Sequence, residues 1–358
     1  MGPGPRSTTW QKRWKGLPLW AWVVGAVVLL GTVAVVLMVV LGGSRVEPEA
    51  HVDEDRFAPA QAYLKAGQYD QAIADLVTMR ATNPNDAELH YWLYRAYSRA
   101  GKVEDAKEVA AQLEAAIAAG DLGAGGHFWL FQIYTESGNS AGQSQALADL
   151  VTAVEAAPDD SEGHFMLGQA YNRVGQLDRA VIEFRKVLEL DPDNAAAHHN
   201  LGVTYFQLLD PDSAIAQFEA ALELDPDDAD THYQLGATYL VLALSGPDPT
   251  QVDDELMAQA VAEVETALEL EPDKPEALIG MGNVYLQQGD YAAATGALER
   301  AIEQAPEQPE GYYALGEAYA QQGEQAKACE TYYHFIELNP PANWRDQAEQ
   351  TMAVWGCQ

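Results

Sequence analysis

The sequence predicts an all-helical solenoid, and three observations carry that prediction. A short motif returns every 34 residues, the spacing inside it suits one face of a helix, and a proline follows at a fixed distance. The motif occurs at Leu167–Tyr171, Leu201–Tyr205, Leu235–Tyr239, Met281–Tyr285 and Leu315–Tyr319. A fixed period of this length indicates stacked helical pairs whose neighbours bury one another's apolar faces.

The unit 161–194 shows how one pair is built. Leu167 and Tyr171 share a helix face because they are four residues apart. Gly168 and Ala180 lack bulk, so two antiparallel helices can cross closely there. Gly175 permits the tight turn between the helices. Pro192 ends the second helix because proline disfavours helical backbone in the residue before it.

This unit resembles the tetratricopeptide repeat family, whose pattern of Leu, Gly, Tyr, Gly, Ala and Pro it carries. The resemblance implies a right-handed solenoid of about eight helix-turn-helix repeats. Five clear units lie between residues 161 and 340, and three degenerate units lie upstream from about residue 53. The third degenerate unit carries roughly three extra residues near 139–145. The tail has Trp344, Ala348, Met352 and Trp355 roughly on one helix face, which is typical of a capping helix.

Three departures from the pattern affect the expected helices. Pro59 lies in the first leading helix, which we therefore expect to be short. Leu209 stands where the turn glycine is expected, followed by Asp210 and Pro211. The segment 244–257 is an insertion, which is either a partner-contacting loop or a tolerated surface loop.

The amino-terminal part predicts a membrane anchor. Residues 1–17 form a basic tail, 18–42 an uncharged apolar run, and 43–55 an acidic linker. The run is long enough to cross the hydrocarbon core of about 30 Å, and it is too long for the core of a cleaved signal peptide. The positive-inside rule places the amino terminus in the cytoplasm. We therefore expect a single-pass membrane protein whose solenoid, 56–340, and capping tail, 341–358, are extracytoplasmic, in a bacterial periplasm or at a cell surface.

The charge of the chain restricts its partners. The net charge is −34, and all of the 54 acidic residues follow the apolar run. Such a surface repels phosphate backbones, so nucleic acid is a poor partner, whereas basic proteins are attracted. We expect protein or peptide partners with basic or apolar segments, and a membrane contact only through 18–42.

Two cysteines and a column of histidines carry the remaining candidate chemistry. Cys329 and Cys357 are expected towards the same end of the solenoid, where they either form a disulfide or remain free thiols. The fourth position of five successive units is histidine. Consecutive leading helices are about 8–10 Å apart, so these rings cannot share one metal ion, and packing is the favoured interpretation. The five are His90, His127, His164, His198 and His232.

The leading helices are expected to line a peptide-binding groove. Their fifth positions are mostly aromatic, and several residues four positions later are amides, so rings could anchor a peptide while amides hold its backbone. The alternative is that some of these rings pack between helices. The candidate groove residues are Tyr91, Arg95, Phe128, Gln132, Phe165, Gln169, His199, Tyr233, Ile279, Asn283 and Tyr313. Family members that bind carboxylate tails use Lys, Arg and Asn across three leading helices. The matching positions here are Phe165, Gln169, Asn200 and Asp230, none of them basic, so that activity is not carried over.

No catalytic motif, metal site or cofactor site is predicted, and the chain is not expected to be an enzyme. The favoured function is a membrane-tethered scaffold or chaperone-like adaptor for proteins outside the cytoplasm. Two alternatives stay open. One is a dedicated structural subunit of an envelope assembly, secretion or cytochrome maturation complex, and the remote one is an enzyme.

Overall fold

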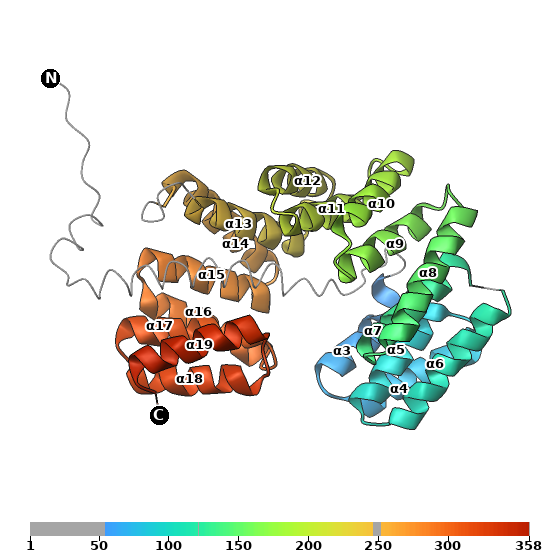
Figure 1. Ribbon diagram of the computed structural model, residues 1–358, viewed down its shortest axis with the longest axis horizontal. Coiled ribbons are helices and arrows are strands. Elements are labelled where there is room, and N and C mark those ends of the chain that lie inside the picture. The colour runs from blue at the N-terminus through green and yellow to red at the C-terminus, as the bar shows by residue number, and fades with distance from the viewer. Residues whose placement is uncertain (1–53, 121, 246–251, 358) are drawn as a thin grey trace, which may run out of the picture. The chain divides into compact units, whose positions relative to one another are not determined.

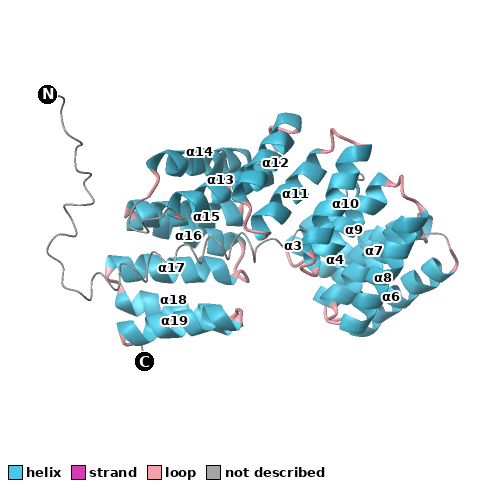
Figure 2. Cartoon of the chain, turned by 45° about the horizontal axis from the view of Figure 1, so that its top comes forward, coloured by secondary structure: helices cyan, strands magenta, loops and turns pink. Residues whose placement is uncertain are grey.

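The computed structural model describes residues 54–120, 122–245 and 252–357. In these ranges it contains seventeen α-helices and no strand, which confirms the all-helical prediction (Figures 1 and 2). The described residues form two compact units, which we call the N-terminal unit (54–226) and the C-terminal unit (227–357).

In both units a leading helix pairs with the trailing helix that follows it. The leading helices of the N-terminal unit are α3 (Glu54–Lys65), α5 (Ala87–Arg99), α7 (Gly123–Glu136), α9 (Ser161–Arg173) and α11 (Ala195–Gln207). Its trailing helices are α4 (Tyr69–Thr82), α6 (Val103–Ala118), α8 (Ser140–Ala156), α10 (Leu177–Leu190) and α12 (Pro211–Leu224).

The C-terminal unit continues the alternation. Its leading helices are α13 (Ala229–Leu244), α15 (Pro275–Gln288) and α17 (Pro309–Gln322), and its trailing helices are α14 (Asp254–Leu270), α16 (Tyr291–Gln304) and α18 (Gln325–Glu337). Helix α19 (Ala342–Trp355) follows and packs on α18.

Close helix crossing explains the small residues of the repeat. A Cβ added at Gly168 would lie 2.7 Å from the ring of Phe184, which is fully buried in α10. Gly202 stands in the same relation to Phe218, again at 2.7 Å. Ala180 is fully buried as well. The glycine thus makes room for the large side chain of the trailing helix, and this fit repeats from pair to pair.

The turns between pairs also start the next helix. The side chain of Asp160 accepts a hydrogen bond of 3.1 Å from the backbone N–H of Gly163, and Asn194 does the same for Ala197 at 2.9 Å. These side chains pair backbone donors that the first turn of a helix leaves free. Asp160 and Asn194 therefore cap the helices that follow them.

Within each unit, the leading helices form one face. Successive leading helices contact each other, as α5 does α7 and α15 does α17, whereas successive trailing helices make no comparable contact in the described residues. Where another leading helix follows in the same unit, the trailing helix instead packs between its own leading helix and that next one. The leading helices therefore approach one another more closely and line the inner side of the stack.

Two positions depart from the repeat pattern, Pro59 in α3 and Leu209 in the turn between α11 and α12. Helix α3 runs through Pro59, so the proline does not interrupt it. The proline lies early in the helix, where the only hydrogen bond that it removes would go to a carbonyl of the first turn. Leu209 takes the turn position with φ of 60°, close to the 72° of Gly175, so the turn survives without glycine.

The insertion lengthens the helices around it. Helices α13 and α14 have 16 and 17 residues, and Asp253 caps α14 through the backbone N–H groups of Glu255 and Leu256. Residues 246–251 lie outside the described ranges. The extra residues of the third pair likewise extend α8, which has 17 residues.

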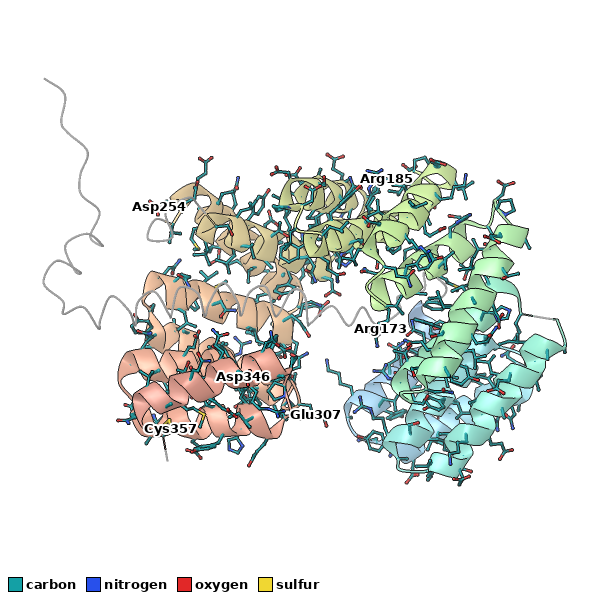
Figure 3. The ribbon with its side chains drawn as sticks, viewed as in Figure 1. Arg173, Arg185, Asp254, Glu307, Asp346 and Cys357 are labelled. Atoms are coloured by element: carbon teal, nitrogen blue, oxygen red, sulfur yellow. A yellow bond between two sulfur atoms is a disulfide. The ribbon has the colours of Figure 1, made fainter. Side chains whose placement is uncertain are left out.

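Helix α19, the segment expected to cap the solenoid, packs on the last trailing helix of the C-terminal unit. Trp344, Ala348 and Met352 are buried, and the ring of Trp344 stacks on Phe335 of α18 with centroids 6.3 Å apart. A disulfide joins Cys329 of α18 to Cys357, with Cα atoms 5.5 Å apart. Figure 3 shows Cys357 beside that helix. The structure thus decides a pairing that the sequence left open.

The predicted localisation is corrected. Across the residues that the structure describes, every helix is too short or too polar to cross a membrane. The segment 18–42, for which a transmembrane helix was predicted, lies outside the described residues.

Candidate functional site

The aromatic row predicted for the groove is buried between helices. No side chain of the row other than His199 is more than 6 % exposed, because each packs against its neighbours. The buried members are Tyr91, Phe128, Phe165, Tyr233, Ile279 and Tyr313. Phe165, for example, meets Phe184 of its own trailing helix edge-on, with ring centroids 5.8 Å apart. The rings therefore hold pairs together instead of forming an open row.

Tyr91 and Arg95, two residues of the predicted groove on α5, both bind Glu136 of α7. Tyr91 donates a hydrogen bond of 2.9 Å to Glu136, and the guanidinium of Arg95 lies 3.3 Å from the same carboxylate. Arg95 also lies over the ring of Trp92 at 5.4 Å. These contacts join α5 to α7 within the inner face.

The amides of the predicted groove differ from the rings, because some have polar atoms without partners. Both amide atoms of Gln169, which is 6 % exposed, lack a hydrogen bond. The same holds for the amide oxygen of Asn283, which is 1 % exposed. Gln132 is also buried. Unpaired buried polar atoms are uncommon in proteins and cost roughly 1–3 kcal/mol each.

Two further residues extend the polar feature around Gln169. The amide oxygens of Asn172, one turn later on α9, and of Asn200 on α11 are also buried without partners. The side-chain nitrogen of Asn172 donates to the hydroxyl of Thr204 at 3.3 Å, so this polar area spans the seam between α9 and α11. We call Gln169, Asn172 and Asn200 the amide patch.

An open pocket of about 180 Å³ lies among the amino-terminal parts of α3, α5, α7 and α9, so it shares α9 with the amide patch. It is lined by Arg56, Asp86, Ala87, Glu88, Leu122, Gly125, Gly126, Trp129, Glu162 and Met166. Glu162, Met166 and Gln169 are spaced four and three residues apart, so the pocket and the amide patch share one face of α9.

The acidic side chains of this pocket are in an unfavourable setting for charge. Burial raises the pKa of Glu88, although hydrogen bonds from Trp92 and Arg56 oppose the change. Burial also raises the pKa of Glu162, and the nearby carboxylate of Asp160 raises it further. A cation placed here would relieve both effects.

Sequence reasoning missed this pocket, although a signal was present. The second position of five leading helices is acidic, and the sixth position is tryptophan or methionine in the three helices around the pocket. The acids are Glu88, Glu162, Asp230, Glu276 and Glu310. The groove prediction considered only the fifth positions, which are mostly aromatic, and the ninth positions, several of which are amides. The signal at the second and sixth positions was therefore not considered.

The histidine column makes contacts inside individual pairs. His164 bonds Glu183 at 2.6 Å, His198 bonds Gln217 at 2.9 Å, and His232 bonds Glu263 at 2.7 Å. In each case the partner lies on the trailing helix of the same pair, so these histidines join the two helices of a repeat. Burial lowers the pKa of His127, which has an unpaired ring nitrogen.

The fold and this inner face define a class of protein, a solenoid of stacked helical pairs. Family models for the tetratricopeptide repeat match residues 63–121, 195–228, 253–295 and 279–343, and a model described as a TPR repeat matches 168–208. Together they span more than half of the chain. The chain belongs to the tetratricopeptide repeat family.

Two solved structures, each aligned at a TM-score above 0.5, show the same fold. Cut9 in the APC/C hetero-tetramer Cut9–Hcn1 is 13 % identical, with 86 % of this chain and 57 % of that chain aligned at a TM-score of 0.58. Yeast Tom70 is 15 % identical, with 91 % and 69 % aligned at a TM-score of 0.55. TTC0263, a thermophilic TPR protein of Thermus thermophilus, is 21 % identical over 55 % of this chain and 98 % of its own, at 0.46. No curated protein matches the sequence significantly. The number of repeats stays a prediction.

Proposed function

We propose that this protein is a scaffold that binds an extended segment of a partner protein on the inner face of its N-terminal unit. Proteins of this family generally bind proteins or peptides and are typically non-catalytic. The observation that carries the proposal is the amide patch, above all the two unpaired amide atoms of Gln169.

An extended peptide supplies the missing partners. Its main chain presents an N–H donor and a C=O acceptor at every residue other than proline, and a glutamine side chain can pair with one of each. These amide atoms are buried in the free chain, so Gln169 holds a peptide group by two hydrogen bonds once its side chain turns towards the inner face, and the amide oxygens of Asn172 and Asn200 then accept from neighbouring N–H groups. Such contacts recognise backbone, so they favour many sequences about equally.

A substitution that keeps the shape of Gln169 separates binding from folding. Gln169→Met removes the polar atoms at nearly constant volume. We expect the free energy of unfolding to rise by about 1–3 kcal/mol, because two unpaired buried groups disappear. We expect the affinity for peptides selected from a random display library on the full chain to fall about tenfold, because two hydrogen bonds are lost.

The matched control is Gln145→Ala, on the exposed side of trailing helix α8. It should change neither the free energy of unfolding nor the affinity for the selected peptides. The proposal is wrong if the library yields no binders, or if Gln169→Met keeps the wild-type affinity for them. Calorimetric titration and urea unfolding provide the two measurements. One partner that co-purifies with the chain in a fixed ratio would instead indicate a dedicated subunit of an assembly.

A further inference from the structure

The pocket beside the amide patch has the composition of a receptor for one side chain. Its volume is about 180 Å³. Ala87, Gly125 and Gly126 contribute almost no side chain to its wall, which leaves this space open. Trp129 and Met166, both nearly buried, supply its apolar surface.

The charges around the pocket select for a cation. The guanidinium of Arg56 is already paired with Asp86 at 2.6 Å and Glu88 at 3.2 Å. Glu162 adds a further carboxylate, so acids outnumber the base by three to one among the lining residues. An incoming carboxylate would meet this excess of like charge, whereas a cation would reduce it.

The aromatic wall favours the same occupant. Lys and Arg combine an apolar stem with a charged head, and the head is attracted to the face of an indole ring. Trp129 and Met166 can contact the stem while Glu162 receives the head. A purely apolar side chain would bury Glu162 without a partner, which is unfavourable.

We propose that this pocket binds a lysine or arginine side chain of the partner segment, with Glu162 as the carboxylate that pairs with it. The inference rests on the proposed function, because the segment that crosses the amide patch positions the basic residue. Glu162, Met166 and Gln169 follow one another along α9, so a single extended segment reaches both.

The experiment compares residue preferences selected by the wild-type chain and by Glu162→Gln. A random peptide display library is the probe, and full-length protein is the bait. We expect the wild type to enrich Lys or Arg at one fixed position, and Glu162→Gln to lose that enrichment while still capturing peptides. In titrations, replacing the selected basic residue with norleucine should weaken wild-type binding about tenfold and change binding to Glu162→Gln little.

Glu155→Gln is the matched control, since it removes the same charge from an exposed position on trailing helix α8. It should keep the basic preference. Peptides captured without a fixed basic position, or a preference retained by Glu162→Gln, would overturn this inference while leaving the proposed function intact. Enrichment of acidic residues that is lost in Arg56→Gln would also overturn it. Failure of the amide-patch test, in contrast, concerns the proposed function itself.

Discussion

Glu317 is a buried carboxyl group whose surroundings change its pKa. Glu317 of α17 occupies the ninth position of its pair, equivalent to Gln169. It is 7 % exposed, its Oε2 has no hydrogen-bond partner, and burial raises its pKa to about 8. The hydroxyl of Tyr332 on α18 is buried without a partner as well. At neutral pH the carboxyl group of Glu317 is therefore mainly protonated.

This carboxyl group makes stability depend on pH. Its pKa is about 8 when folded and near 4.5 when unfolded, so the unfolded state releases the proton first as pH rises. The contribution of Glu317 to stability is present below about pH 4.5 and is lost progressively up to about pH 8. We expect Glu317→Gln to be more stable than the wild type at about pH 9 and to differ much less at about pH 5.

Urea unfolding at both pH values measures this difference. Glu303→Gln, at an exposed position of α16, is the control and should leave the pH profile unchanged. A stability difference between Glu317→Gln and the wild type that is the same at both values would contradict the assignment.

At the scale of elements, the turn inside each pair determines how the two helices meet. Gly175, Gly289 and Gly323 adopt φ between 72° and 80° there, and Leu209 is held at 60°. A left-handed conformation costs a residue with a Cβ roughly 1–2 kcal/mol. The surrounding pair tolerates that cost because α11 and α12 pack as tightly as their neighbours, with Phe218 fully buried.

Leu209→Gly should therefore stabilise the chain. The side chain of Leu209 is 71 % exposed, so its loss removes little packing. We expect a gain of about 1 kcal/mol from relief of backbone strain, partly offset by the greater freedom of glycine in the unfolded chain. Thermal unfolding should show a higher Tm. A lower Tm would mean that the exposed leucine contributes packing that its accessibility does not indicate. Gly175→Leu, the reverse change at an equivalent turn, should destabilise.

Sequence reasoning predicted most of these elements but less of the site. Gly175 and Pro192 mark a turn and a helix end by local conformational preferences, so their roles can be derived without knowledge of neighbouring helices. The exposure of the aromatic row could not be derived in this way, because it depends on contacts between helices. Whether Phe165 faces a groove or Phe184 depends on how far apart the two helices are, and that distance is set by side chains on both.

For the whole molecule, charge is the dominant property. The chain carries a net charge of −34, with 54 acidic and 20 basic residues. Most acids are on the surface, where their long-range field attracts cations and is screened by salt. A basic partner segment would therefore be drawn towards the protein before any specific contact forms, and the pocket at Glu162 would hold it afterwards.

Association with a selected basic peptide should therefore depend on ionic strength mainly through its rate. Between about 0.05 and 0.5 M salt we expect the association rate constant to fall about tenfold or more, and the dissociation rate constant to change much less. Stopped-flow fluorescence measures both. A dissociation rate constant that changes more than the association rate constant would contradict long-range attraction. The same peptide with norleucine in place of its basic residue serves as the control and should show a weaker dependence.

The sequence by itself determined the helices, their pairing and the family, because these follow from residues close together in the chain: a repeated helical face, a small residue at the helix crossings and a proline after most pairs. Only the tertiary structure decided that the aromatic row is buried, that Cys329 and Cys357 are joined, and that Arg56, Glu162 and Trp129 line one pocket. These properties depend on the spacing between helices that are distant in sequence. That spacing results from packing among many side chains, which no single repeat encodes.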